Sequence, residues 1–430
     1  MRTALWILAA LPLLALALIG FRYLIRGTPV QHVRGASLHG GTPSVRDEEF
    51  TDSVELLARV TLRPGNAVEV LCCGDDTFPR LWDDLRSAQR SITLQMYYCK
   101  PGVVADQMAA ILQERARAGV RVLFLRDAFG GQDLPKQYLR GLRDAGVEVA
   151  DFRPVRWYQL ETAYNRSHIR VVTVDGMIGY TGGFGLDDKW LGDGLHENQW
   201  RDTNVRFTGP AVRDLQAAFA TGWAEATGEL LVGDRFFVPL ALLEGAPGVH
   251  AGVMHAAPTI GSTAADRLLA LTMAGARQRL YITNAYFVPD EDLVGQLCAA
   301  ARRDVDVRVL TAGERTDVTT VLWAGRARYE RLLTAGVRIY EYQPATLHAK
   351  AFVVDGCFGS VGTMNFDNRS IAFNDESNFL FRDAALGELL LHVFHADLRH
   401  AREFTLEAVR RRPLWDRVRE RVADFFTRVL

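Results

Sequence analysis

Two histidines in this chain each have a cation two residues further along. His168 and Arg170 lie in the run HIRVVTVDG, and His348 and Lys350 lie in HAKAFVVDG, 180 residues later. Residues i and i+2 of a strand face the same side of a sheet, so each imidazole projects together with its cation. One such pair is ordinary in a strand. The repeat, however, predicts that two units pack together and form one site with two imidazoles and two cations.

Two imidazoles beside two cations suit exchange at a phosphodiester. Neutral imidazole is a competent nucleophile near its pKa of about 6.5, and a second, protonated imidazole can donate to the departing alkoxide. A phosphohistidine intermediate then lets an alcohol or water accept the phosphoryl group. We expect Arg170 and Lys350 to stabilise the charged phosphoryl oxygens. We expect no metal ion or other cofactor, since the sequence holds no metal-ligand cluster.

Each motif reaches an Asp-Gly pair, at Asp175 and at Asp355, and a second β-like run follows. Asp-Gly between two such runs is the strongest short signal for a hairpin. Two interpretations of these aspartates stay open, namely turn residues or members of the catalytic set. The candidate phosphate ligands lie in and after the second runs and comprise Gly183, Ser360, Thr363 and Asn365.

The two motifs close two copies of a longer pattern. A strand-like run at 88–98 recurs at 276–287, a second at 117–125 recurs at 303–310, and a third at 145–149 recurs at 335–339. The first two runs are separated by apolar residues at helical spacing, which are Val104, Met108, Ile111, Leu112 and Ala116. Strands that alternate with helices indicate parallel βαβ units. We therefore predict an α/β fold of two similar domains related by a pseudo-twofold axis.

The length of 430 residues suits two domains with additional segments. We expect a first domain over 50–245 and a second over 246–412, divided in the Gly- and Pro-bearing stretch at 245–262. Residues 27–49 are rich in Gly, Ser, Thr, Pro and charge, and are predicted to be a linker.

Residues 3–21 carry no charge and are long enough, as a helix, to span most of a bilayer core. Bulky and basic residues follow this run, which favours a retained anchor over 1–26 rather than a cleaved signal peptide. Arg22, Arg26 and Arg34 lie behind the run and only Arg2 lies before it. The positive-inside bias therefore places the body of the protein in the cytoplasm.

Charge and cysteine content narrow the class of protein. The 50 basic and 51 acidic residues give a net charge of −1, which disfavours a non-specific nucleic-acid binder. Only four of the basic residues are lysines, at positions 100, 136, 189 and 350. The five cysteines are scattered and suit a reducing compartment.

The C-terminal segment 413–430 has an amphipathic helical pattern. Its apolar residues fall on one stripe, and arginines occupy the other positions. A basic amphipathic helix suits a membrane surface, and a terminal helix docked on its own domain is the alternative.

The run HAKAFVVDGCFGSVGTMN resembles the His-x-Lys-x4-Asp motif of the phospholipase D superfamily. The wider pattern is similar to bacterial cardiolipin synthases in the segments YITNAYFVPD (281–290), GGFGLDDKWLG (182–192), WRDTNVRFTGPAV (200–212) and LLTAGVRIYEYQ (332–343). The resemblance covers the chain from about residue 70 to the C-terminus.

This resemblance implies a two-lobed α/β fold with one shared active site at the inner membrane of a bacterium. It implies an enzyme that joins two phosphatidylglycerols, or a related phospholipid pair, into cardiolipin. His168 would be the nucleophile and His348 the general acid. It also implies two carboxylates that orient the imidazoles, Glu376 for the second half and Asp202 for the first, although surface charge or helix capping is an alternative role for both.

Two positions depart from the family pattern. Arg170 replaces the lysine of the first motif, and Gly185 replaces an asparagine after the Gly-Gly pair. An arginine is a planar fork rather than a point charge, so this exchange changes the geometry of the site. The alternatives to cardiolipin synthesis are a hydrolytic phospholipase D, another phosphodiesterase or nuclease, and a non-catalytic membrane relative.

Overall fold

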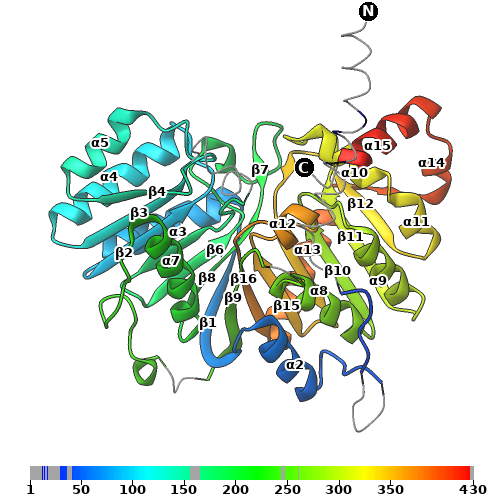
Figure 1. Cartoon of the computed structure of the whole chain (residues 1–430), viewed down its shortest axis with the longest axis horizontal. Helices are drawn as coiled ribbons and strands as arrows, with labels where there is room; N and C mark the ends of the chain where they lie inside the picture. The colour runs from blue at the N-terminus through cyan, green and yellow to red at the C-terminus, as the bar shows by residue number, and fades with distance from the viewer. Residues whose placement is uncertain are drawn as a thin grey trace, which may run out of the picture.

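The computed structural model describes residues 12, 14, 17, 30–35, 41–154, 165–243, 247–259 and 261–426. One mixed sheet of 15 strands runs through the molecule, in the order β17-β12-β11-β10-β14-β15-β16-β9-β1-β8-β6-β5-β2-β3-β4. Helices cover both faces of this sheet, and Figure 1 shows two similar lobes side by side with β1, β9 and β16 between them. The predicted α/β class is confirmed.

The first part of the chain forms α2 (Glu48–Ala58), β1 (Arg63–Cys72), α3 (Cys73–Ser87), β2 (Ser91–Met96), α4 (Val103–Arg117), β3 (Arg121–Asp127), α5 (Lys136–Asp144), β4 (Glu148–Phe152), β5 (Val171–Val174), β6 (Ile178–Gly182), the 3-10 helix η1 (Asp188–Trp190), β7 (Trp200–Arg201), β8 (Thr203–Thr208), α7 (Ala211–Thr227) and the 3-10 helix η2 (Leu240–Leu242). We call this part the first half.

The second half forms β9 (Val249–Ala256), α8 (Ala264–Gly275), β10 (Arg279–Asn284), α9 (Glu291–Ala301), β11 (Asp306–Ala312), α10 (Thr319–Arg326), α11 (Tyr329–Thr334), β12 (Arg338–Tyr342), β13 (Thr346–Leu347), β14 (Lys350–Val354), β15 (Phe358–Gly362), α12 (Asn368–Ala372), β16 (Glu376–Arg382), α13 (Ala384–Leu398), β17 (Ala401–Phe404), α14 (Leu406–Arg410) and α15 (Leu414–Phe426).

The strand order reads alike from both sides of the sheet. From the centre outwards, β1, β8, β6, β5, β2, β3 and β4 correspond to β9, β16, β15, β14, β10, β11 and β12. The strands β2, β3 and β4 are parallel, as are β10, β11 and β12, in agreement with the predicted βαβ units. Because β9 pairs with both β1 and β16, the sheet continues without a break from one half to the other.

The hydrophobic core also joins the two halves. One cluster of buried side chains combines residues of α7 and β8 with residues of α13 and β16. The rings of Phe207 and Phe379, one from each half, lie 4.7 Å apart between centroids. Aromatic burial of this kind holds the halves in one fixed relation.

The predicted anchor at 1–26 lies outside the described residues, apart from three isolated positions. Within the part of the chain that the structure describes, no helix is long and apolar enough to cross a membrane.

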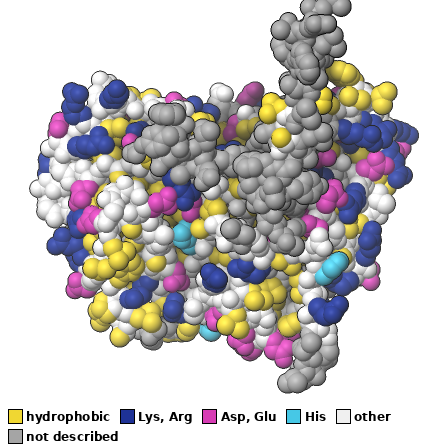
Figure 2. Space-filling view, viewed as in Figure 1, with side chains coloured by type: hydrophobic (Ala, Val, Ile, Leu, Met, Phe, Trp, Pro, Cys, Tyr) yellow, Lys and Arg dark blue, Asp and Glu magenta, His cyan; other side chains and the backbone are white. Residues whose placement is uncertain are grey.

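The C-terminal helix α15 packs on α10. Ala423 is buried against Val288 and Ala324, and the Arg419 guanidinium lies 4.3 Å from the centre of the Trp323 ring. Four apolar residues of α15 are exposed, with 75%, 73%, 41% and 54% exposure at Leu414, Trp415, Val418 and Val422. Figure 2 shows hydrophobic side chains at the upper right of the molecule, where Figure 1 places α15.

Candidate active site

The two histidines lie where the halves exchange backbone hydrogen bonds. The His168 N–H donates to the carbonyl of Asp375 (2.9 Å), and the His348 N–H donates to the carbonyl of Arg201 (2.7 Å). The short strands β13 and β7 pair in parallel just before His348, and Ser167 forms the matching bridge to Asp375. Each histidine therefore lies beside the segment of the other half that carries Glu376 or Asp202.

The imidazole–carboxylate contacts consequently cross between the halves. His168 Nδ1 lies 3.1 Å from both carboxylate oxygens of Glu376, and His348 Nδ1 lies 2.8 Å from Asp202 Oδ2. We expected Glu376 to orient the histidine of its own half, His348, and Asp202 to orient His168. This pairing is wrong, because the backbone contacts place each carboxylate beside the histidine of the other half. Both carboxylates are fully buried, which excludes surface charge as their role.

His348 lies between aromatic rings of the first half. The Trp200 ring stacks on the imidazole with centroids 4.7 Å apart, and the Trp190 ring meets it edge-on at 5.3 Å. The Trp190 indole N–H also donates to Asp202 Oδ2 (2.8 Å). Lys350 Nζ lies 3.0 Å from each ring nitrogen of His348, so the cation predicted from the motif lies against the imidazole.

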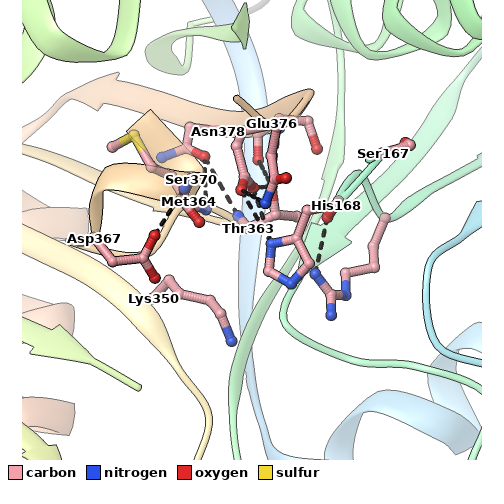
Figure 3. A network of polar contacts seen from close by, with 12 residues as sticks. Ser167, His168, Lys350, Thr363, Met364, Asp367, Ser370, Glu376 and Asn378 are labelled. Carbon is pink, nitrogen blue, oxygen red and sulfur yellow. Dashed lines mark hydrogen bonds and ion pairs between the residues drawn. The ribbon is translucent and has the colours of Figure 1, made fainter. Parts of the chain in front are cut away.

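His168 has a related but different environment. Tyr97 meets the imidazole edge-on, with centroids 5.2 Å apart. The Arg170 guanidinium donates through one Nη to the His168 carbonyl (2.8 Å), while its buried Nε has no partner among the residues that the structure describes. Figure 3 shows Lys350 extending towards the space that the His168 ring faces. Among the described residues, the predicted pair of imidazoles and pair of cations thus gather in one buried place.

Burial and neighbouring cations keep both imidazoles neutral. Burial lowers the pKa of His168 well below its usual range, and Arg170 and Lys350 lower it further. Burial likewise lowers the pKa of His348 to about 3, with Lys350 as the next cause and Asp202 opposing it. The pKa of Lys350 itself falls to about 7, mainly because the ammonium is buried.

The pKa values of the two acidic side chains shift in opposite directions. Burial alone would raise the pKa of Asp202, but the contacts with His348 and Trp190 outweigh it and hold this pKa at about 2. Burial raises the pKa of Glu376 to about 8, although Thr363 Oγ1 donates to it at 2.5 Å. Asp202 is therefore ionised at neutral pH, whereas Glu376 holds a proton.

Asp175 and Asp355 stand apart from this chemistry. The Asp175 carboxylate accepts the backbone N–H groups of residues 89–91, and the Asp355 carboxylate accepts those of residues 277–279. These N–H groups lie at the starts of β2 and β10. Both aspartates have positive φ, 55° and 49°, and lie in the hairpins β5–β6 and β14–β15. The hairpin prediction is confirmed, and these backbone contacts favour turn residues over members of the catalytic set at both positions.

The predicted phosphate ligands fall into two groups. Asn365 Oδ1 is buried and has no partner within the described residues, so it remains available to the site. Thr363, in contrast, donates to Glu376, and Ser360 accepts from Asn378 Nδ2 (3.2 Å). A side chain at Gly183 would collide with the Asp202 carboxylate, since an added Cβ would lie 2.3 Å from Oδ2. Gly183 is thus required by close packing.

The Gly185 departure has a local cause. An added Cβ at Gly185 would lie 2.9 Å from the Trp190 ring and 3.0 Å from the Tyr98 carbonyl oxygen. The indole of Trp190 therefore fills the place where the second half carries Asn365, and it donates instead to Asp202. The first half exchanges an amide for an indole.

Several site residues were not predicted as such. Trp190, Trp200 and Tyr97 resemble core aromatics in the sequence, and only their contacts with the imidazoles give them a place in the site. Arg369, on α12, adds positive charge near His168. Its position is 180 residues after Lys189, a correspondence that the repeat could have provided.

Comparison with known proteins shows the family to which this chain belongs. The family described as "Cardiolipin synthase, PLD-like domain" matches residues 81–223 and 269–398. The chain belongs to this family. It is 37% identical to the cardiolipin synthase of Geobacillus kaustophilus over 364 residues, which covers 84% of this chain and 72% of that protein. It is 30% identical to a probable cardiolipin synthase of Bacillus subtilis, over 91% of this chain and 77% of that protein.

A solved structure has a similar fold. The phosphatidylserine synthase of Haemophilus influenzae superposes with a TM-score of 0.67 at 12% identity, covering 89% of this chain and all of that one. At this identity the similarity establishes the α/β fold alone.

Proposed function

We propose that this protein is a phosphatidyltransferase that forms cardiolipin from phosphatidylglycerol and a second phospholipid. The observation that carries the proposal is the crossed pair of buried imidazole–carboxylate contacts, His168 with Glu376 and His348 with Asp202, in a member of the cardiolipin synthase family. Each Nδ1 faces an acidic side chain of the other half, which leaves Nε2 of His168 for the substrate, while Lys350 Nζ lies 3.0 Å from Nε2 of His348.

In the first step, His168 Nε2 attacks the phosphorus of the donor lipid. The new P–N bond forms as the P–O bond to the glycerol head group breaks, and His348 gives its proton to the departing oxygen. Entry of the anionic phosphodiester between Arg170 and Lys350 adds a negative charge, which favours protonation of His348. The ionised Asp202 then stabilises the imidazolium through Nδ1.

In the second step, the hydroxyl of the acceptor lipid attacks the same phosphorus. Its proton passes to His348, the P–N bond to His168 breaks, and cardiolipin leaves with the enzyme regenerated. Water in place of the lipid hydroxyl would give phosphatidic acid, the outcome of a hydrolytic phospholipase D. The acceptor that reaches the site therefore decides between transfer and hydrolysis.

The proposal places the protein at a bacterial inner membrane, with its body in the cytoplasm. The apolar run at 3–21 supports a single-pass anchor. The outward apolar face of α15 supports a second contact, in which Leu414, Trp415 and Val418 enter the lipid surface. The enzyme would then meet phospholipids in the layer where they lie.

The test is product analysis with the purified full-length chain in phosphatidylglycerol vesicles. Cardiolipin and glycerol in equal amounts are expected, and the His168→Ala and His348→Ala chains should form neither. Phosphatidic acid as the main product would replace the proposal with a hydrolase. Oligonucleotide cleavage without lipid turnover would replace it with a nuclease, and no turnover of either would make the chain a non-catalytic relative.

A further inference from the structure

Lys189 lies at the rim of the candidate site, against the aromatic rings that hold His348. Its Nζ is 5.0 Å from the centre of the Trp200 ring and 5.8 Å from that of Tyr98. The Trp200 ring in turn stacks on His348 at 4.7 Å. The two Trp200 distances together place the ammonium within about 10 Å of the His348 imidazole.

The two aspartates next to Lys189 in the sequence accept backbone N–H groups. The adjacent Asp187 accepts the backbone N–H of Lys189 itself, and Asp188 accepts those of residues 103 and 104. Within the described residues Lys189 forms no ion pair, and it is only half-buried. A cation that the protein holds on aromatic rings without an anion is available to a ligand anion.

A second lysine lies beside the same ring. Lys100 Nζ is 5.3 Å from the centre of the Tyr98 ring and 3.7 Å from Asp133 Oδ2. With Lys350 inside the site, three of the four lysines of this chain lie at or next to the active site, and Lys136 on α5 is the exception. Lys100 and Lys189 together form what we call the rim lysines.

The position of Lys189 has a counterpart in the other half. Lys189 follows the capping Asp187 of η1, and Arg369 follows the capping Asp367 of α12, 180 residues later. Arg369 adds positive charge near His168. The site thus has an inner pair of cations, Arg170 and Lys350, and an outer pair with one member towards each histidine.

In the proposed reaction the two outer cations, Lys189 and Arg369, lie near different substrates. His348 protonates the departing glycerol, and the same histidine must deprotonate the incoming alcohol, so the acceptor enters on the His348 side. An acceptor phosphatidylglycerol carries its own phosphodiester three carbons from the reacting hydroxyl. That second phosphate would lie just beyond His348, which is the side on which Lys189 lies.

We propose that Lys189, assisted by Lys100, binds the phosphodiester of the acceptor lipid and so selects an alcohol that carries a phosphate over an uncharged alcohol or water. This inference rests on the proposed function and specifies its second substrate. When the acceptor oxygen bonds to phosphorus and the P–N bond to His168 breaks, the acceptor phosphate remains bound to the rim lysines, while the hydroxyl proton passes to His348.

The test compares two acceptors in the full-length chain. Cardiolipin formation in phosphatidylglycerol vesicles uses an acceptor with a phosphate, and exchange of labelled glycerol into phosphatidylglycerol uses an acceptor without one. For Lys189→Gln we expect cardiolipin formation to fall about tenfold, the equivalent of one charge-assisted hydrogen bond. Glycerol exchange should stay within about twofold of the parent chain.

Matched variants separate this role from others. Lys189→Arg keeps the charge and should retain most cardiolipin formation, and Lys136→Gln removes a distant, exposed lysine and should change neither reaction. An equal loss of both reactions in Lys189→Gln would overturn the inference, because Lys189 would then act by supporting Trp200 and His348. No loss in either reaction would also overturn it. Absence of both reactions in the parent chain would instead refute the proposed function.

Discussion

The two imidazoles of the site share a motif but have different partners. Asp202, with a pKa of about 2, stays ionised beside His348, whereas Glu376, with a pKa of about 8, keeps a proton beside His168 at neutral pH. A fixed negative charge favours an imidazole that must carry a proton during the reaction. A neutral partner leaves the other imidazole uncharged, as a nucleophile must be. The difference supports His168 as nucleophile and His348 as acid and base.

Lys350 gives the activity a predicted pH dependence. Burial lowers the pKa of its ammonium to about 7, so the charge is present below that pH and is lost above it. Because this charge faces the anionic phosphoryl group, kcat/KM should fall as the pH rises through about 7. The Lys350→Arg variant keeps its charge at all accessible pH values, so its alkaline limb should move to higher pH even if its maximal rate is lower.

Two buried acids titrate in the same pH range as Lys350, and their effect on the rate must be distinguished from that of the lysine. Burial raises the pKa of Asp367 to about 7 and that of Glu376 to about 8. An alkaline limb that stays in place in Lys350→Arg, measured between pH 5.5 and 9, would assign it to one of these acids and contradict the role given to Lys350.

At the scale of elements, the β5–β6 and β14–β15 hairpins connect the motif strands to the neighbouring strand entries. Asp355 is buried and accepts three backbone N–H groups at the start of β10. Asp355→Ala removes the acceptor that these donors share and places alanine at a positive φ. We expect unfolding free energy to fall by roughly 3 kcal/mol in urea titration.

Asp355→Asn is the matched control, since asparagine keeps one acceptor oxygen and tolerates this backbone conformation. Both variants should retain kcat well below their unfolding temperatures. An Asp355→Asn chain with normal stability and no turnover would restore the catalytic interpretation of this residue.

The helix α15 should contribute to membrane binding through its outward face. Replacing Trp415 and Val418 by Asp removes apolar area from the exposed stripe and adds negative charge, so binding to phosphatidylglycerol vesicles should weaken at least tenfold in a flotation assay. Asp substitution at Arg411, which is exposed on the preceding turn, is the control for charge alone. Equal binding of the Trp415/Val418 variant and its parent would refute membrane contact by α15.

For the whole molecule, the crossed contacts make the site a property of a single chain. Each histidine needs a carboxylate from the other half, and the continuous sheet and shared core fix both halves in that chain. Mixing equal amounts of His168→Ala and His348→Ala chains should therefore restore no cardiolipin formation. Recovery of activity in the mixture would mean that the site forms between chains.

The sequence predicted those features that depend on short spacing. The helix around Met108 and the Asp-Gly hairpins follow from local patterns and are confirmed. The motif strands are shorter than predicted, because β5 begins at Val171 and β14 at Lys350, so that both histidines precede them. The crossed contacts could not be read in this way, because Asp202 and His348 lie 146 residues apart and meet only once the halves dock. Likewise, an aromatic such as Trp190 has the same sequence signature whether it fills a core or orients a carboxylate.

The most direct measurement of the central claim is a trapping experiment with an activated nitrophenyl phosphodiester of a lipid. This leaving group departs without a proton, so His348→Ala should release one nitrophenolate per chain in a burst and then stall. Mass spectrometry of the quenched protein should locate the phosphatidyl group on His168, and His168→Ala should give no burst. A burst in His168→Ala, or an adduct on any residue other than His168, would contradict the mechanism.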